Sequence, residues 1–358
     1  MKIGMLTSGG DCPGLNAVMR AFAKHVGSHI DGVKIYGFLD GYTGLIENEY
    51  ELLEPRDFEK LLLVGGTVLG SKRQPFKQMT VADENNRSKL DKMKETYSRL
   101  ALDCLVILGG AGTHKTAALL SEAGCNVVGL PKTIDNDIWG TEITFGFHTA
   151  MEVATECIDR MHSTAASHGR TMLVEVMGNK AGWLALYAGL AGGANVILIP
   201  EIPYDEKAVI DFLEKRRKEG ARYNIVAVAE GALSREEYAM KKKERAALRA
   251  KRGETTATAR LAENIRRATG VETRTQIIGY LQRGGSPDPY DRALCTLMGS
   301  YAGELVEKKK FGVTVAFSCG KMVYNSLSDV AGKLKSVPPS CQVVKAAKAV
   351  GISFGEPL

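Results

Sequence analysis

The chain has 358 residues, of which 44% are apolar and 25% are charged, the proportions of a globular protein. This length is enough for two domains of ordinary size, each with its own core. No apolar run approaches the roughly 20 residues needed to span a bilayer, and the first strand-like run leads into a glycine turn, unlike a signal peptide. The seven cysteines are scattered and form no Cys-x-x-Cys pair. We therefore expect a cytoplasmic protein with reduced thiols and no membrane association.

The elements expected from the residue patterns alternate along the whole chain. Short β-type runs occur at residues 3–6, 33–38, 104–108, 127–130, 172–176, 196–199, 225–229, 277–281 and 313–317. Helix-like segments lie between them, at residues 16–26, 87–100, 115–123, 150–166, 206–220, 256–269 and 292–309. Strict alternation of strands and helices predicts an α/β fold whose parallel sheets are covered by helices on both faces.

The net charge of +6 has a local source. Residues 241–252 include seven lysines or arginines and one glutamate, so the rest of the chain is close to neutral. Nucleic-acid binding would also require interleaved aromatic residues, and only Tyr238 lies near this stretch. We expect residues 233–255 to form an added helical hairpin arm with a solvated basic face. A role in subunit contact or effector binding is the alternative, and nucleic acid is not expected as a partner.

Two carboxylates, Asp135 and Asp137, follow the buried-strand run 127–130 closely. Parallel strands end on the ligand side of an open α/β sheet. One carboxylate at such a position can accept a proton from a hydroxyl nucleophile while its neighbour attends to a metal or a phosphate. Read alone, however, Asp-Asn-Asp is equally consistent with a solvated turn.

Glycine-rich turns follow two other expected strands. Gly9-Gly10 lies between a strand and the helix near Asn16, and Gly109 to Thr113 lies between a strand and the helix beginning at His114. Backbone amides and a helix N-terminus would face an anion at both turns, although glycine pairs are also ordinary tight turns. Neither a P-loop nor a Gly-x-Gly-x-x-Gly turn is present. Two turns on one sheet edge favour a cradle for a polyphosphate.

The chain resembles the 6-phosphofructokinase family in several motifs that occur in the family's order, at residues 7–16, 65–71, 131–137, 174–178, 272–274 and 279–287. The resemblance implies two similar doubly wound, mostly parallel-sheet domains, with the chain crossing between them more than once. Residues 1–145 plus 280–325 would bind the phosphoryl donor, a nucleotide. Residues 146–279 plus 326–358 would bind a sugar phosphate.

The resemblance also implies site residues. The donor would be held by Gly10, Arg73, Gly110, Gly112, Thr113 and Lys132. Fructose 6-phosphate would be bound by Thr133, Asp135, Asp137, Arg170, Met177, Glu230, Arg274, Tyr280 and Arg283. Asp135 would be the base, with Thr133 and Arg170 also catalytic. Arg170 and Arg274 would come from a neighbouring subunit, so a homotetramer with shared sites is expected. Mg²⁺ would be the cofactor, with Asp137 as the candidate ligand.

Three positions depart from the family pattern. Ala111 stands where an aspartate normally helps to organise Mg²⁺, Asn179 where an arginine is common, and Lys132 where many ATP-using members have glycine. Gly112 permits ATP, because relatives that use pyrophosphate tend to carry a carboxylate there. The pair Gly112 and Lys132 resembles a mixed branch of the family whose members commonly use ATP.

The resemblance therefore implies a glycolytic, ATP-dependent 6-phosphofructokinase, which transfers the γ-phosphoryl of MgATP to the 1-hydroxyl of fructose 6-phosphate. Two alternatives remain open at this point. Lys132 also suits a pyrophosphate-dependent phosphotransferase, and the missing carboxylate at Ala111 suits a catalytically impaired binding or regulatory subunit. Asp135, Asp137 and the expected arginines argue against the impaired subunit.

Overall fold

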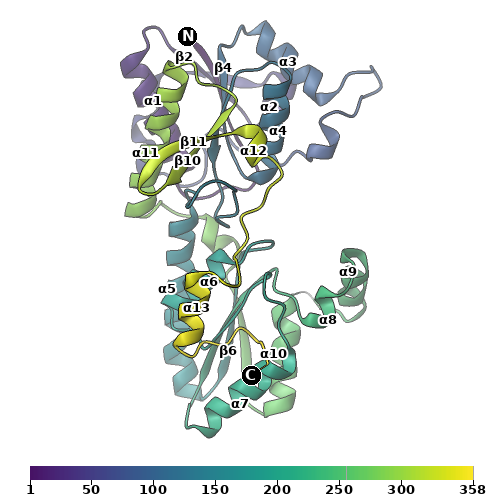
Figure 1. The fold of residues 1–358 in the computed structure, drawn as a ribbon. Coiled ribbons are helices and arrows are strands. Elements are labelled where there is room, and N and C mark those ends of the chain that lie inside the picture. The colour runs from purple at the N-terminus through teal and green to yellow at the C-terminus, as the bar shows by residue number, and fades with distance from the viewer. Residues whose placement is uncertain (255, 358) are drawn as a thin grey trace. The chain divides into compact units, whose positions relative to one another are not determined.

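The computed structural model describes residues 1–254 and 256–357, which form two compact units. Unit 1 consists of residues 1–149 and 283–335, and unit 2 consists of residues 150–282 and the segment from residue 336 onward. Thr255, the last residue of the expected arm, and Leu358, the last residue of the expected second domain, lie outside the described residues. Each unit is an α/β layer structure, as the alternation of strands and helices predicts (Figure 1).

Unit 1 contains a seven-stranded sheet in the order β11-β10-β5-β4-β1-β2-β3. The strands are β1 (Lys2–Ser8), β2 (Lys34–Phe38), β3 (Tyr50–Leu53), β4 (Cys104–Gly109), β5 (Val127–Pro131), β10 (Val313–Ser318) and β11 (Lys321–Ser326). The inner strands β10, β5, β4, β1 and β2 are parallel, whereas β3 and β11 pair antiparallel at the two edges. Strand β3 has only four residues and β11 mixes polar with apolar residues, and neither contains a buried residue, so both lack the apolar run that predicts an inner strand.

Helices cover both faces of this sheet (Figure 1). One face carries α1 (Leu15–His29) and α11 (Pro289–Glu307), which pack together. The other carries α2 (Tyr42–Glu47), α3 (Lys89–Arg99), α4 (Ala111–Glu122) and α12 (Leu327–Val330). The 3₁₀ segments η1 (Pro55–Leu63) and η2 (Phe76–Gln78) complete the unit. Strands β4 and β5 are buried along their whole length because the helices cover both sides.

The strand order of unit 1 contains a switch point. After β1 the chain forms β2 on one side of β1, and later forms β4 on the other side. Ligands of open α/β sheets bind outside the carboxyl ends of the strands at such a point. The loops after β1, β4 and β5 lie at this edge, and they contain the two glycine turns and the Asp135–Asp137 pair.

Unit 2 contains a four-stranded parallel sheet in the order β7-β8-β6-β9. Its strands are β6 (Thr171–Val176), β7 (Val196–Leu198), β8 (Asn224–Ala229) and β9 (Thr273–Ile277). Helices α5 (Phe147–His168), α6 (Trp183–Ala191) and α13 (Gln342–Ala349) lie on one face, and α7 (Glu206–Lys218) and α10 (Ala257–Thr269) on the other (Figure 1). Helix α5 begins in unit 1 and continues into unit 2.

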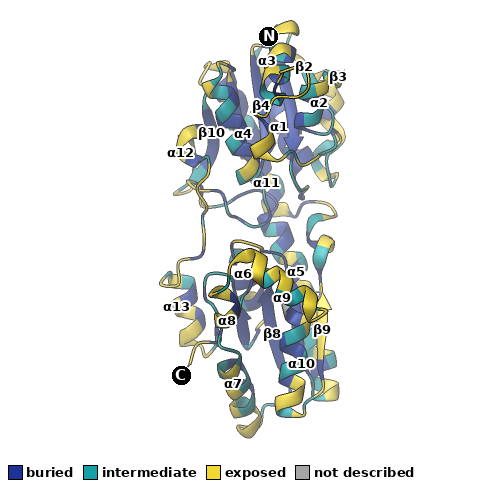
Figure 2. Ribbon diagram, turned by 90° about the vertical axis from the view of Figure 1, so that its right-hand side faces the viewer, coloured by how far each residue is buried: buried dark blue, intermediate teal, exposed yellow. Residues whose placement is uncertain are grey.

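The basic stretch forms two short helices, α8 (Arg235–Tyr238) and α9 (Lys242–Lys251), of which α9 is largely exposed (Figure 2). Two expectations from the sequence need correction, namely the end of one strand and the start of one helix. The strand expected at 277–281 instead ends at Ile277, because Gly279 adopts a left-handed conformation (φ +55°) and the 3₁₀ helix η3 (Gly279–Arg283) follows. Helix α4 begins at Ala111 rather than at His114. Among the described residues, no helix has the length and apolar character to cross a membrane.

Candidate active site

The loop after β5 carries the two candidate carboxylates. Its residues alternate between buried and half-buried from Lys132 to Ile138, and Asp135 and Asp137 are both half-buried. The backbone N–H of Asp135 donates to Thr133 Oγ1 at 3.1 Å. Asn136 has a left-handed backbone (φ +51°), which turns the chain between the two aspartates. Both carboxylates therefore belong to a folded loop at the carboxyl edge of the unit 1 sheet.

Cationic side chains gather around Gly10, in the loop after β1. The ammonium of the buried Lys132 donates to the Gly10 carbonyl oxygen. A Cβ atom on Gly10 would lie 2.8 Å from Nη1 of Arg283, so the guanidinium lies directly against this glycine. The pKa of Lys132 is lowered, chiefly because its side chain is buried, and Arg283 and Arg73 lower it further. The turn therefore offers concentrated positive charge to an anion.

The second glycine turn forms the N-terminus of α4. Gly110 is the N-cap, without a capping side-chain hydrogen bond, and Ala111, Gly112 and Thr113 form the first helical turn. The Thr113 hydroxyl donates to the Ser8 carbonyl at 3.4 Å, which joins this turn to the end of β1. A Cβ atom on Gly112 would meet no described heavy atom within 4 Å. The first-turn amides of a helix attract anions, and the space over Gly112 leaves room for one.

His114 links the N-terminal turn of α4 to β10 by hydrogen bonds. Its Nδ1 lies 3.1 Å from the Gly110 carbonyl oxygen, and its Nε2 lies 2.8 Å from the Thr314 hydroxyl. A carbonyl can only accept, so Nδ1 carries the proton and Nε2 accepts from Thr314. Burial lowers the pKa of His114 to about 4, so the ring is neutral at physiological pH.

Unit 2 places several of the expected sugar-phosphate residues at the carboxyl ends of its strands. Met177 follows β6 and Glu230 follows β8, and the Glu230 N–H donates to the Val176 carbonyl at 2.8 Å. The Gln282 side-chain oxygen accepts from the Met177 N–H at 3.3 Å. Tyr280 lies in η3 and is 77% exposed. Asn179 is exposed in the loop that continues from Met177.

Arg170 and Arg274 lie at the opposite, amino edge of the same sheet. Arg170 immediately precedes β6, and Arg274 pairs in register with Met172 near the start of that strand. A strand rises about 3.3 Å per residue, so Arg170 and Met177 are separated by roughly 20 Å along β6. A hexose phosphate is much shorter than this distance. Unit 2 of a single chain therefore does not bring the two arginines to the site of Met177 and Glu230.

One carboxylate, Glu272, orients both of these arginines. Its Oε2 lies 2.9 Å from Arg170 Nε, and its Oε1 lies 2.6 Å from Arg274 Nη2. The pKa of Glu272 is lowered, chiefly by its ion pair with Arg170. The sequence motif at 272–274 contained this residue, but the motif gave no reason to pair Glu272 with Arg170, about a hundred residues away. Strand pairing between β6 and β9 provides the reason.

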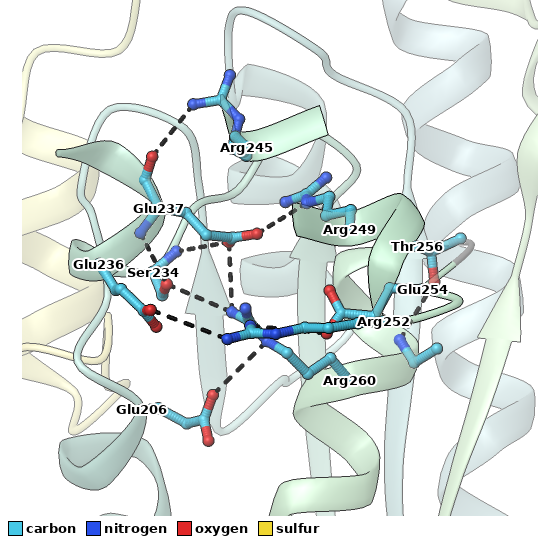
Figure 3. Close-up of polar contacts among 11 residues, drawn as sticks. Glu206, Ser234, Glu236, Glu237, Arg245, Arg249, Arg252, Glu254, Thr256 and Arg260 are labelled. Carbon is cyan, nitrogen blue, oxygen red and sulfur yellow. Dashed lines mark hydrogen bonds and ion pairs between the residues drawn. The ribbon is translucent and has the colours of Figure 1, made fainter. Parts of the chain in front are cut away.

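The basic arm is attached to unit 2 by a buried carboxylate (Figure 3). The Glu237 side chain is 1% exposed and lies 2.7 Å from Arg249 Nε and 3.3 Å from Arg260 Nη2. Its carbonyl oxygen accepts from Arg245 Nη1 at 3.3 Å. Burial alone would raise the pKa of Glu237, but the arginines lower it. Part of the arm's positive charge therefore serves to fix the arm rather than to bind a partner.

The described residues contain no group of three or more His, Cys, Asp or Glu side chains able to hold a metal. Ala111 offers no carboxylate to the α4 turn. A Mg²⁺ ion needs few protein ligands, because it keeps waters and takes oxygen ligands from substrate phosphates. The Asp135–Asp137 loop supplies carboxylates of the kind that such an ion prefers, so the residues present suit a metal that arrives with a nucleotide.

The comparison with known proteins agrees with the motifs. The phosphofructokinase family model matches residues 2–306. The chain is 53% identical to the ATP-dependent 6-phosphofructokinase of Spirochaeta thermophila over 99% of this chain and 97% of that protein. It is 44% identical to ATP-dependent 6-phosphofructokinase 3 of Bacteroides thetaiotaomicron over 99% of this chain and all of that protein.

The fold comparison gives the same result. The structure of phosphofructokinase from Saccharomyces cerevisiae superposes with a TM-score of 0.76 at 28% identity and covers 98% of this chain. This chain spans 46% of the yeast chain. The family model and the full-length relatives confirm the resemblance seen in the motifs, and the solved structure confirms the predicted α/β fold class. The chain belongs to the phosphofructokinase family.

Proposed function

We propose that this protein is an ATP-dependent 6-phosphofructokinase, which transfers the γ-phosphoryl of MgATP to the 1-hydroxyl of fructose 6-phosphate in glycolysis. Two relatives that match along nearly their whole length carry that name. The observation that carries the proposal is the arrangement at the carboxyl edge of unit 1. There, the Asp135–Asp137 loop follows β5, and Lys132 at its start donates to the glycine turn after β1.

The donor half of the proposal rests on charge and space. Gly10, Gly110 and the first-turn amides of α4, including that of Thr113, would face the phosphates of ATP, and Gly112 leaves room for a nucleotide. Lys132 and Arg73 would offset negative charge that develops during transfer. Mg²⁺ enters as part of the substrate MgATP, and Asp137 would contribute a carboxylate oxygen to it.

The acceptor half rests on the loop carboxylates. Asp135 would accept the proton of the 1-hydroxyl while the hydroxyl oxygen forms a bond to the γ-phosphorus of ATP. The bond between this phosphorus and the oxygen that bridges it to ADP breaks at the same time. Thr133, whose hydroxyl accepts from the Asp135 N–H, would keep the loop in its reactive form. The sugar phosphate would contact Met177, Glu230 and Tyr280, and Arg283 would bind it from beside the Gly10 turn.

The same proposal requires an oligomer. The arginine pair Arg170 and Arg274 lies at the amino edge of the unit 2 sheet, far from Met177 and Glu230 of the same unit. We therefore assign the pair to the sugar-phosphate site of a neighbouring subunit. A homotetramer is the assembly proposed, working in the cytoplasm, where glycolysis takes place.

A coupled assay with fructose 6-phosphate tests the proposal. The purified protein is assayed separately with MgATP and with Mg-pyrophosphate, and fructose 1,6-bisphosphate is detected through aldolase. We expect turnover with MgATP and little with pyrophosphate. Turnover only with pyrophosphate would replace ATP as the donor. Turnover with neither donor, in a protein that still binds fructose 6-phosphate, would favour a binding subunit over an enzyme.

A further inference from the structure

Lys335 contacts the Asp135–Asp137 loop and the residues that follow it, although about 200 residues separate the lysine from the loop in the chain. Its ammonium donates to Asn136 Oδ1 at 2.8 Å, to the Thr141 carbonyl at 2.9 Å and to the Glu142 carbonyl at 2.9 Å. These acceptors are uncharged oxygen atoms that match the three donors of an ammonium group. The lysine therefore joins both ends of the segment from Asn136 to Glu142.

Asn136 connects this lysine to the candidate base. It is buried, stands between Asp135 and Asp137, and has a left-handed backbone. Its Oδ1 accepts from Lys335 and from the Thr144 N–H at 3.1 Å, and its Nδ2 donates to the Glu142 carbonyl at 3.3 Å. An asparagine tolerates the left-handed conformation better than most residues, and these hydrogen bonds fix its side-chain amide.

The hydrogen bonds continue from Asn136 to the backbone of Asp135. The Thr144 hydroxyl donates to the Thr133 carbonyl at 2.7 Å, and the Thr133 hydroxyl accepts from the Asp135 N–H at 3.1 Å. A continuous set of contacts thus runs from Lys335 through Asn136 and Thr144 to the residue proposed as the base. A displacement of the ammonium would be transmitted to the loop by these contacts.

The backbone of the lysine segment reinforces the same arrangement. The Lys335 N–H donates to the Asp137 carbonyl at 2.9 Å, and Leu334 forms an antiparallel bridge with Ile138. Lys335 is also the last residue of unit 1 before the chain passes to unit 2. Main chain and side chain of one short segment therefore both hold the loop that carries Asp135 and Asp137.

We infer that Lys335 is a positioning residue for the phosphoryl transfer, which fixes the Asp135–Asp137 loop through Asn136 without contacting the substrates. The inference rests on the proposed function, in which Asp135 is the base. Catalytic groups must be held within a fraction of an ångström of their working geometry, and a small displacement reduces turnover strongly. Loss of the ammonium therefore lowers kcat more than it changes either KM.

The test compares Lys335→Met with Lys333→Met, a matched control at an exposed lysine two residues earlier in the same segment. Steady-state constants are measured with MgATP and fructose 6-phosphate, together with thermal melting. We expect kcat of Lys335→Met to fall about 10- to 100-fold, with both KM values within about threefold of wild type. The control keeps wild-type constants. An unchanged kcat, or a loss confined to KM, overturns the inference.

Lys335→Arg provides a second variant in case Lys335→Met does not fold. It keeps the positive charge, but the planar guanidinium does not direct three donors from one nitrogen. We expect a folded protein whose kcat is lowered at least fivefold, and a wild-type kcat overturns the inference. The wild-type protein, measured in the same assay, separates this outcome from failure of the proposed function. A wild type that is inactive with MgATP refutes the proposed ATP-dependent activity, whereas an active wild type with unaffected Lys335 variants refutes only the role of Lys335.

Discussion

The Asp135–Asp137 loop of unit 1 and the Arg170–Arg274 pair of unit 2 are both proposed to act on fructose 6-phosphate, the pair in the site of a neighbouring subunit, and the structure holds the two groups differently. The loop is fixed by hydrogen bonds among buried or half-buried groups of its own unit, including that from Lys335 to Asn136. The arginine pair is held by a single, partly exposed carboxylate, Glu272. The loop is thus organised within one chain, whereas the arginines remain at a surface.

This difference predicts different consequences for substitutions. A buried, hydrogen-bonded loop holds its reactive carboxylate in one position. Removal of that carboxylate therefore slows the chemical step. An exposed ion pair contributes little to stability and mainly orients the side chains for a ligand. Changes in the loop are therefore expected in kcat, and changes in the arginine pair in the KM for the sugar phosphate.

The largest effect is expected from Asp135→Ser. Loss of the proposed base should lower kcat about 10³- to 10⁴-fold, because a positioned general base contributes up to roughly that factor. The affinity for fructose 6-phosphate, measured by calorimetry, should change far less. Near-normal turnover in this variant would show that Asp135 is not the base and would remove the distinction between the two regions.

A smaller effect is expected from the arginine pair. Arg274→Ala should raise the KM for fructose 6-phosphate about 10- to 100-fold, since a charge-assisted hydrogen bond to a phosphate contributes roughly 1.5 to 3 kcal/mol. Glu272→Gln, which keeps both arginines but weakens their orientation, should raise it only a few-fold. The KM for ATP and the melting temperature are the controls. A larger effect on kcat than on KM would contradict the assignment of the pair to substrate binding.

Acid is expected to lower the stability of unit 1 through the buried His114. The pKa of His114 is about 4 in the folded protein against 6.5 ordinarily, so between these values only the unfolded chain binds the proton. Stability is therefore lost as the pH falls through this window, by roughly 2 kcal/mol between pH 7 and pH 5. Urea unfolding of wild type and His114→Asn at both pH values measures the difference. An equal loss in the variant would assign the acid sensitivity to other groups.

The smallest effect is expected at the donor turn. Ala111→Asp returns a carboxylate to the first turn of α4, where the family usually has one. It should lower the Mg²⁺ concentration needed for half-maximal activity a few-fold and raise the rate with ATP, because the metal opposes the charge of the phosphates. A Mg²⁺ titration at saturating ATP measures this. A folded variant with lower activity and an unchanged Mg²⁺ requirement would remove support for the donor assignments at this turn.

The sequence predicts the fold class because its buried strands are continuous apolar runs, such as residues 127–130, separated by helices. It does not predict the edge strands β3 and β11, because β3 has only four residues, β11 mixes polar with apolar residues, and neither strand is buried. The sequence pattern also extends β9 too far, since a single left-handed glycine at position 279 turns an apolar run into a 3₁₀ helix.

The candidate site shows the same limit. Asp135 and the glycine turns can be found from local motifs, because each motif is contiguous and follows a strand. No motif indicates a role for Lys335 or His114, and the motif that contains Glu272 does not indicate its pairing with Arg170. Each of these residues contacts residues brought near by sheet pairing or by a chain crossing. Contacts over such sequence distances follow from topology and cannot be predicted from local patterns.

Subunit complementation tests most directly the claim that the loop and the arginine pair of one chain serve different active sites. One variant carries both Arg170→Ala and Arg274→Ala and so lacks the arginine pair. The other carries Asp135→Ser and so lacks the proposed base. At a fructose 6-phosphate concentration near the wild-type KM, neither form alone should show much activity. Co-expressed with different affinity tags and purified as verified hybrids, the two forms should recover part of the wild-type activity at that concentration. This recovery is predicted because some sites then combine an intact loop with an intact arginine pair. Hybrids with no activity above that of the separate variants would contradict the claim and would place both groups in the site of a single chain.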